Sequence, residues 1–325
     1  MDNPVVPPSG SVYAEALERR VKVLDVAMIL RRDGVFAALW TPTDAKGRLL
    51  ESELKTILRF VRSKAVHGIL TLGSTGEFPH LGLAVRRRVM EVAAGEGEGL
   101  MVLANISDIR PGVVSELGRQ ARSLGLSAVA LLPPCFYQVA QADLVEFFVR
   151  AGQAAQLPLL LYNYPERTGN RIELETIGAV ADRTALMGVK QSGADFDYHR
   201  PLVQLGRERG FVVFTGSEPR LAEAMALGVT GCVSGLANAV PELVVEVFEA
   251  AKAGRAPSVA TTVSRLQALG RLMETLEFPL NVSAAIAARG LPVGKPKSVV
   301  SASTQARYQR LVLELRHLYR EWNLI

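Results

Sequence analysis

The sequence predicts an α/β fold, a (β/α)8 TIM barrel with a C-terminal helical appendage. The first observation is that short apolar runs alternate with longer amphipathic segments over residues 33–255. Several of these runs are apolar throughout, as parallel strands buried on both faces require. The second observation is that this alternation occurs eight times. Repeated strand–helix units form parallel sheets, and eight of them close a barrel with its active site at the carboxyl ends of the strands.

Each predicted element follows from its pattern. The strands are short apolar runs: Val35–Trp40, Gly68–Leu72, Met101–Ala104, Ala128–Leu132, Leu159–Tyr162, Leu186–Val189, Val212–Thr215 and Gly231–Ser234. The helices are the amphipathic segments that follow: Leu50–Ser63, Ala84–Ala94, Gly112–Leu124, Gln141–Ala155, Glu173–Val180, Phe196–Glu208, Pro219–Ala226 and Pro241–Ala251. An open, doubly wound sheet is the alternative, but it commonly carries a glycine-rich first turn. The first turn here, Thr41-Pro42-Thr43-Asp44, contains no GxGxxG, which favours the barrel.

The chain divides into three predicted parts. Residues 1–32 form an N-terminal extension, residues 33–255 the barrel and residues 256–325 a helical region. The strand pattern stops after about Arg255, and the helix-like stretches that remain are Ser258–Leu276, Leu280–Ala288 and Thr304–Glu321.

Composition and charge exclude several classes of function. The net charge is +5, but the basic residues are scattered, so a nucleic-acid partner is not predicted. The two cysteines and four histidines lack metal-ligand spacing, so no metal is predicted. No apolar stretch reaches the ~18–20 residues that a membrane span needs, and no signal peptide is apparent. We therefore expect a cytoplasmic protein without a membrane partner.

Lys190 is the most informative single residue. It follows the apolar run Leu186–Val189, so its side chain is expected at the mouth or in the interior of the barrel. A lysine is rarely buried without a reason, and desolvation favours a neutral amine that can attack a carbonyl. The alternative is a lysine just beyond the strand that extends to solvent.

Other strand ends carry further candidates. Tyr162 ends the preceding strand, so its phenol is expected beside Lys190, where it can move protons; the alternative is a core tyrosine. The turn Gly73-Ser74-Thr75-Gly76-Glu77 offers hydroxyls and backbone N–H groups that suit a carboxylate, although it could be an ordinary connection. Arg167 could hold a second carboxylate or be a surface arginine. Ser217, after the seventh strand, is a further candidate for substrate binding.

Together these segments resemble the motifs of one superfamily, that of dihydrodipicolinate synthase and N-acetylneuraminate lyase. Residues Gly73–Glu77 resemble its GxTGE motif, Tyr162–Pro165 its YNxP motif and Gly188–Lys190 its GxK motif. The similarity runs from about Gly34 to the C-terminus and includes Thr41-Pro42.

The resemblance implies a class I aldolase. Lys190 would form a Schiff base with pyruvate or a larger 2-oxo acid, and an aldehyde would be added or released. Gly73, Ser74 and Thr75 would hold the carboxylate, with Thr75 also in the catalytic set. Tyr162 would move protons, and the backbone carbonyl near Val233 would lie beside the lysine. No metal or organic cofactor is implied, and a homotetramer or homodimer is expected.

The sequence departs from the family pattern in ways that bear on the substrate. Phe136 stands where the family commonly has a relay tyrosine, with Tyr137 next to it. Arg167 matches the arginine with which dihydrodipicolinate synthases hold aspartate semialdehyde. Residues Gly73–Leu81 and Lys190–Asp195 look more like the 4-hydroxy-2-oxoglutarate and sugar-acid aldolases. Three hypotheses follow: an aldolase for a hydroxy-2-oxo acid, a 4-hydroxy-tetrahydrodipicolinate (dihydrodipicolinate) synthase, and a non-catalytic 2-oxo-acid-binding barrel.

Overall fold

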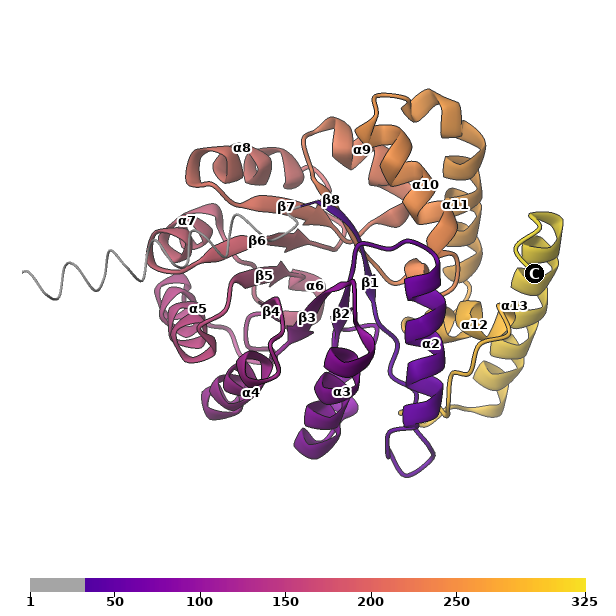
Figure 1. Cartoon of the computed structure of the whole chain (residues 1–325), viewed down its shortest axis with the longest axis horizontal. Helices are drawn as coiled ribbons and strands as arrows, with labels where there is room; N and C mark the ends of the chain where they lie inside the picture. Colours follow the sequence, from indigo (N-terminus) through magenta and orange to yellow (C-terminus); the bar gives the residue numbers. More distant parts are fainter. Residues whose placement is uncertain (1–32) are drawn as a thin grey trace, which may run out of the picture. The chain divides into compact units, whose positions relative to one another are not determined.

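Eight parallel strands form a closed barrel in the computed structural model, which describes residues 33–325 (Figure 1). Each strand pairs with its neighbour in chain order, and the first pairs with the last, with Phe36 opposite Val233. The strands are β1 (Gly34–Ala38), β2 (Gly68–Thr71), β3 (Met101–Asn105), β4 (Ala128–Leu131), β5 (Leu159–Asn163), β6 (Leu186–Gln191), β7 (Val212–Thr215) and β8 (Gly231–Ser234). The predicted TIM barrel is therefore confirmed. The predicted N-terminal extension, 1–32, lies outside the described residues.

The alternation of side chains along the strands separates an inner from an outer face. Outward positions such as Val35 and Val189 belong to a large apolar cluster that the surrounding helices cover. Inward positions meet across the barrel: the rings of Phe36 on β1 and Phe214 on β7 lie 5.3 Å apart although these strands are not adjacent. Gly68 leaves room for the Phe36 ring, because a Cβ there would lie 2.4 Å from it. Residues on either side of Val189 consequently point into the barrel.

The helices surround the barrel, as Figure 1 shows. The barrel helices are α2 (Glu51–Ser63), α3 (Leu83–Glu96), α4 (Pro111–Ser123), α5 (Gln141–Ala155), α6 (Pro165–Thr168), α7 (Leu174–Arg183), α8 (His199–Arg209), α9 (Leu221–Ala226) and α10 (Pro241–Lys252). The C-terminal helices are α11 (Ala260–Met273), α12 (Leu280–Ala288) and α13 (Ala302–Glu321). The last helix begins at Ala302 rather than Thr304 because the Ser301 side chain caps it, accepting a hydrogen bond from the Thr304 amide.

One boundary difference matters for the site. The sixth strand was predicted to end at Val189, but β6 continues through Lys190 to Gln191. Its last residues pair on both sides: Lys190 lies opposite Tyr162 on β5 and Phe214 on β7. Lys190 therefore lies within the barrel wall, and the predicted strand ended two residues too early.

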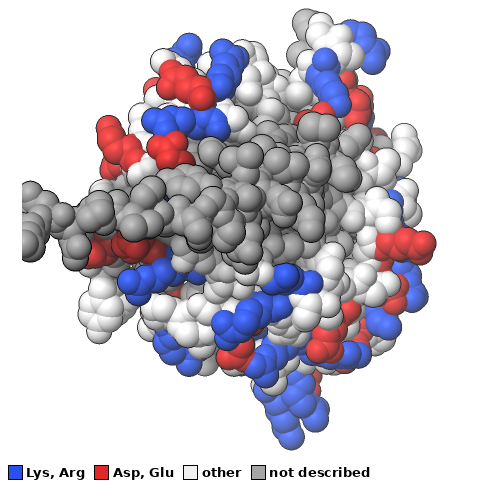
Figure 2. Space-filling model, turned by 60° about the vertical axis from the view of Figure 1, so that its left-hand side comes forward, with Lys and Arg blue, Asp and Glu red and all other residues white. Residues whose placement is uncertain are grey.

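The surface and helices of the described part add two observations. Figure 2 shows Lys and Arg side chains interspersed with Asp and Glu on the face that it presents. Ion pairs in the described part join residues of opposite charge: Arg88 contacts both Glu51 and Glu91, and Arg59 contacts Glu96. Among residues 33–325, no helix is long and apolar enough to cross a bilayer.

Candidate active site

Lys190, Tyr162 and Ser74 converge inside the barrel mouth. The Lys190 side chain is on the inner face of β6, and the residue is only 4% exposed. Its Nζ lies 3.9 Å from the centroid of the Tyr162 ring, so the amine sits on the negative face of the aromatic ring. The Tyr162 hydroxyl lies 2.8 Å from Ser74 Oγ, a hydrogen-bond distance. An amine and two hydroxyls from three different strand ends thus form one connected group.

These side chains line a cavity at the carboxyl ends of the strands. Its volume is about 240 Å³, which suits a small molecule rather than a drug-sized ligand. Its polar walls include Ser74, Thr75, Tyr162, Tyr164, Lys190, Ser192, Glu218 and Asn281. A larger depression of about 720 Å³ lies between residues 44–53 and 291–295, but no candidate catalytic side chain lines it. The converging polar groups, rather than size, therefore identify the site.

The turn after β2 presents Ser74 and Thr75 to the cavity. Leu72 and Glu77, on either side of the turn, both have left-handed backbones, with φ of 59° and 56°. Asn105 Nδ2 donates a hydrogen bond of 2.8 Å to the Leu72 carbonyl and holds this entry to the turn. Gly76 packs against the segment that follows β1, since a Cβ there would lie 3.0 Å from the Leu39 carbonyl oxygen. Gly73 belongs to the turn but does not line the cavity.

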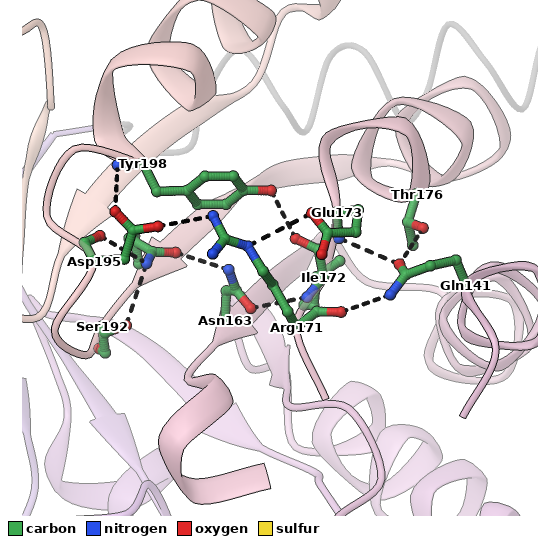
Figure 3. Close-up of polar contacts among 10 residues, drawn as sticks. Gln141, Asn163, Arg171, Ile172, Glu173, Thr176, Ser192, Asp195 and Tyr198 are labelled. Atoms are coloured by element: carbon green, nitrogen blue, oxygen red, sulfur yellow. Dashed lines mark hydrogen bonds and ion pairs between the residues drawn. The ribbon is translucent and has the colours of Figure 1, made fainter. Parts of the chain in front are cut away.

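A buried pair of amides braces the strands that carry Tyr162 and Lys190. Asn163 and Gln191 are the next residues along β5 and β6, and they lie opposite each other in register. Asn163 Nδ2 donates to Gln191 Oε1 at 2.8 Å, while Asn163 Oδ1 accepts from the Ile172 amide at 3.0 Å. Figure 3 shows Asn163 inside a wider polar network. Because adjacent residues point to opposite faces, the pair fixes the two strand ends from outside the barrel.

Arg171 extends the same network across the loops. Its guanidinium pairs with Asp195 at 2.9 Å and lies 3.9 Å from the Tyr198 ring centroid (Figure 3). The Tyr198 hydroxyl donates to the Ile172 carbonyl at 2.8 Å. Burial raises the pKa of Tyr198 to about 12, so the phenol stays protonated and can donate this bond. The loop after β5 is thus tied to the loop after β6.

The remaining predicted residues lie at different distances from the cavity. Val233 lines it, on β8. Arg167 is exposed and does not line the cavity. Its guanidinium carbon lies 5.3 Å from the ring centroid of Phe278, and Phe278 does line the cavity. Ser217 does not line it either, since its amide donates to Thr215 Oγ1 at 3.1 Å and its two neighbours face the cavity instead.

Phe136 is exposed in this chain and does not occupy a buried position at the cavity. It is 85% exposed, with a φ of 81°, and its ring makes an edge-to-face contact with Tyr137 at 4.8 Å. Tyr137 is itself 70% exposed. Neither ring lines the cavity.

Two contributions to the cavity were missed by the sequence reasoning. Glu218 lines it, with Oε1 accepting a hydrogen bond from the Leu236 amide at 3.2 Å. Glu218 begins the short helical turn Glu218–Arg220 beyond the end of β7, where strand alternation no longer fixes the direction of a side chain. The C-terminal helical region supplies a wall that includes Met273, Phe278 and Asn281, and no local pattern could have shown this.

Neither cysteine lines the cavity. Cys232 is fully buried beside Val233, and burial raises the pKa of its thiol well above the ordinary value, so the thiol remains protonated. Among residues 33–325, no group of His, Cys, Asp and Glu side chains could hold a metal ion.

Comparisons with known proteins agree with this architecture. Residues 31–317 match the model of the dihydrodipicolinate synthetase family, so the chain belongs to that family, whose members are lyases and aldolases. A 4-hydroxy-tetrahydrodipicolinate synthase from Methanopyrus kandleri is 30% identical over 290 residues, covering 88% of this chain and 96% of the relative. An uncharacterised DapA-like lyase from Halobacterium salinarum is 30% identical over 266 residues, covering 82% of this chain and 87% of the relative. The crystal structure of YagE, a family member from E. coli in complex with pyruvate, has a TM-score of 0.81 at 24% identity and covers 88% of this chain and 98% of YagE.

Proposed function

We propose that this protein is a Schiff-base-forming lyase that cleaves or forms a hydroxy-2-oxo acid, with Lys190 as the nucleophile. The observation that carries the proposal is the buried Lys190 amine, 3.9 Å from the centroid of a ring whose hydroxyl lies 2.8 Å from Ser74. A buried lysine amine next to a phenol that can carry protons is the arrangement that nucleophilic catalysis by lysine requires.

The proposed reaction begins at the 2-oxo carbon. The Lys190 amine adds to this carbon, and loss of water gives a protonated imine. In the cleavage direction, the C4 hydroxyl loses its proton, the C3–C4 bond breaks, and its electron pair passes into the imine to form an enamine. An aldehyde leaves, C3 is protonated, and water releases the 2-oxo acid with a free lysine. Tyr162, hydrogen-bonded to Ser74, would carry the protons of imine formation and cleavage.

Glu218 favours a hydroxylated substrate over one with a second carboxylate. It places a carboxylate in a cavity of about 240 Å³. One of its oxygens is engaged by the Leu236 amide, at 3.2 Å. A second substrate carboxylate near Glu218 would face like charge, whereas a hydroxyl could donate to it. Ser192 and Asn281 add polar groups to the same cavity. This supports the sugar-acid aldolase type, whereas the second carboxylate of 4-hydroxy-2-oxoglutarate would have to lie away from Glu218.

The second candidate is condensation of pyruvate with aspartate semialdehyde, as in the synthases among the relatives. Arg167 favours it, because its guanidinium lies over Tyr164 and Phe278, two residues that line the cavity. A change of Arg167 rotamer toward the cavity would offer a forked cation to the second carboxylate. The synthase and the aldolase share the Schiff base and differ in the aldehyde.

The non-catalytic barrel is the third candidate, and Phe136 is its motivation, since a phenyl ring cannot carry a proton. The Tyr162–Ser74 pair supports turnover without that residue.

The exposed Phe136 and Tyr137 rings support the expected homodimer or homotetramer, since contact with a second copy would cover them.

Borohydride trapping combined with a substrate panel tests the proposal. The protein is incubated with pyruvate and sodium borohydride, and intact mass is measured; Lys190→Ala is the matched control. We expect a reduced pyruvyl adduct in the wild type and none in the control. The panel then compares 4-hydroxy-2-oxoglutarate, 2-oxo-3-deoxy sugar acids and pyruvate with aspartate semialdehyde. Turnover of pyruvate with aspartate semialdehyde alone would favour the synthase. If no 2-oxo acid forms an adduct, the non-catalytic binding barrel is the candidate that remains.

A further inference from the structure

A buried ion pair joins the turn that carries Ser74 and Thr75 to the C-terminal region. Lys297 Nζ lies 2.6 Å from Glu77 Oε2, and the two residues are 220 positions apart in the sequence. Their side chains are only 3% and 6% exposed. Burial lowers the pKa of Lys297, and the Glu77 charge opposes that shift. The contact lies beside the cavity but contains no atom of the proposed reaction.

The segment that carries Lys297 packs against the residues that follow β1. The Trp40 indole donates to the Val293 carbonyl at 2.9 Å. Gly294, with φ of 72°, packs so closely that a Cβ would lie 2.5 Å from the Thr43 carbonyl oxygen. Lys297 Nζ lies 4.6 Å from the Trp40 ring centroid. These contacts hold the ammonium in one place, so it can act as a fixed anchor.

Glu77 links the fixed Lys297 ammonium to the turn that carries Ser74 and Thr75. Its backbone is left-handed, an unfavourable conformation for a residue other than glycine. Its amide donates to the Ser74 carbonyl at 3.0 Å, which closes the turn around Thr75 and Gly76. A shift of Glu77 would therefore move both hydroxyls that face the cavity. Buried ion pairs often add little stability compared with apolar replacements, so the position of this pair suggests orientation rather than stabilisation.

We propose that Lys297 is a positioning residue: through Glu77 it sets the orientation of Ser74 and Thr75, and so the affinity for the carboxylate of the 2-oxo acid. The C-terminal helical region thereby controls the substrate-carboxylate turn of the barrel as well as lining the cavity. This inference rests on the proposed function, because it assumes that the turn holds that carboxylate.

The test measures pyruvate affinity and reactivity separately. The fraction of protein trapped by borohydride is followed against pyruvate concentration, which yields an apparent affinity and a limiting rate. Lys297→Met should weaken the affinity roughly tenfold, about the effect of losing one charge-assisted hydrogen bond, with little change in the limiting rate. Lys297→Arg should recover most of the affinity. Lys295→Met, an exposed lysine on the same segment, is the control and should match the wild type.

A second variant separates positioning from folding. Glu77→Gln combined with Lys297→Met leaves no lone buried charge, so this protein should fold even if Lys297→Met alone does not. Its weakened affinity with a wild-type limiting rate would support the inference. Wild-type affinity in either folded variant, or a proportionate loss of affinity and rate in both, would overturn it. A wild type that forms no pyruvate adduct would overturn the proposed function and this inference together.

Discussion

Tyr162→Phe is the substitution that isolates proton transfer from binding. It removes one oxygen atom, the hydroxyl 2.8 Å from Ser74 Oγ, and leaves the ring that packs 3.9 Å from Lys190 Nζ. The ring also keeps its stacking with Tyr164, at a centroid distance of 6.0 Å. Binding of the 2-oxo acid should therefore change little.

The expected loss in kcat is ~10²–10⁴-fold, the range for one general acid–base group, or about 2.7–5.5 kcal/mol of barrier. The free energy of unfolding should fall by only about 1 kcal/mol, the net value of one hydrogen bond. The assay is the steady-state rate with the best substrate of the panel, with KM and the thermal midpoint measured beside it. Ser74→Ala is the matched variant, because it removes the other end of the same hydrogen bond. A loss of less than about tenfold in kcat for Tyr162→Phe would refute the assigned role.

Three further predictions concern the walls of the site and the groups around it. Glu218→Gln should leave borohydride trapping of pyruvate unchanged. The ratio of kcat/KM for hydroxylated aldehydes to kcat/KM for aspartate semialdehyde should fall about tenfold, the value of about one hydrogen bond to a charged group. An unchanged ratio would contradict the role given to Glu218. Asn163→Ala should lower the free energy of unfolding by about 2–6 kcal/mol in denaturant titrations, because it leaves the Ile172 amide and the side-chain oxygen of Gln191 without their partner. A loss below about 1 kcal/mol would argue against the brace. The pKa of Cys232 is raised, so above the ordinary value of 9.0 the folded state keeps a proton that the unfolded state loses. The contribution of this thiol to stability is therefore full below pH 9.0 and declines as pH rises above it. Cys232→Ala should flatten the fall in the free energy of unfolding with pH, and an identical slope in both proteins would show that other groups cause it.

The barrel could be predicted from the sequence because its signal is local. Each strand is a short run that is apolar on both faces, and these runs recur between amphipathic helices. The same regularity located Lys190 and Tyr162 at neighbouring strand ends, where register now pairs them. Ser74 and Thr75 were found in the same way, from the turn after β2, and both line the cavity.

What the sequence could not provide depends on contacts between distant segments. The ion pair of Glu77 with Lys297 spans 220 residues, and each residue alone resembles a solvated surface charge. The cavity wall formed by Phe278 and Asn281 comes from a helical region whose pattern shows only which faces are apolar. Glu218 was overlooked for a different reason: it lies beyond the end of β7, where the direction of a side chain depends on how the backbone turns, and motif position alone does not give it.

The measurement that tests the central claim most directly is the location of the borohydride-trapped adduct. The protein is reduced in the presence of pyruvate, digested, and every lysine-containing peptide is examined by mass spectrometry, with Lys190→Ala treated in parallel. Lys297, whose side chain is buried against Glu77 in the turn after β2, serves as the internal comparison. We predict a single modified residue, Lys190, and no adduct in Lys190→Ala. An adduct on Lys297 or on surface lysines, with Lys190 unmodified, would contradict the Schiff-base mechanism.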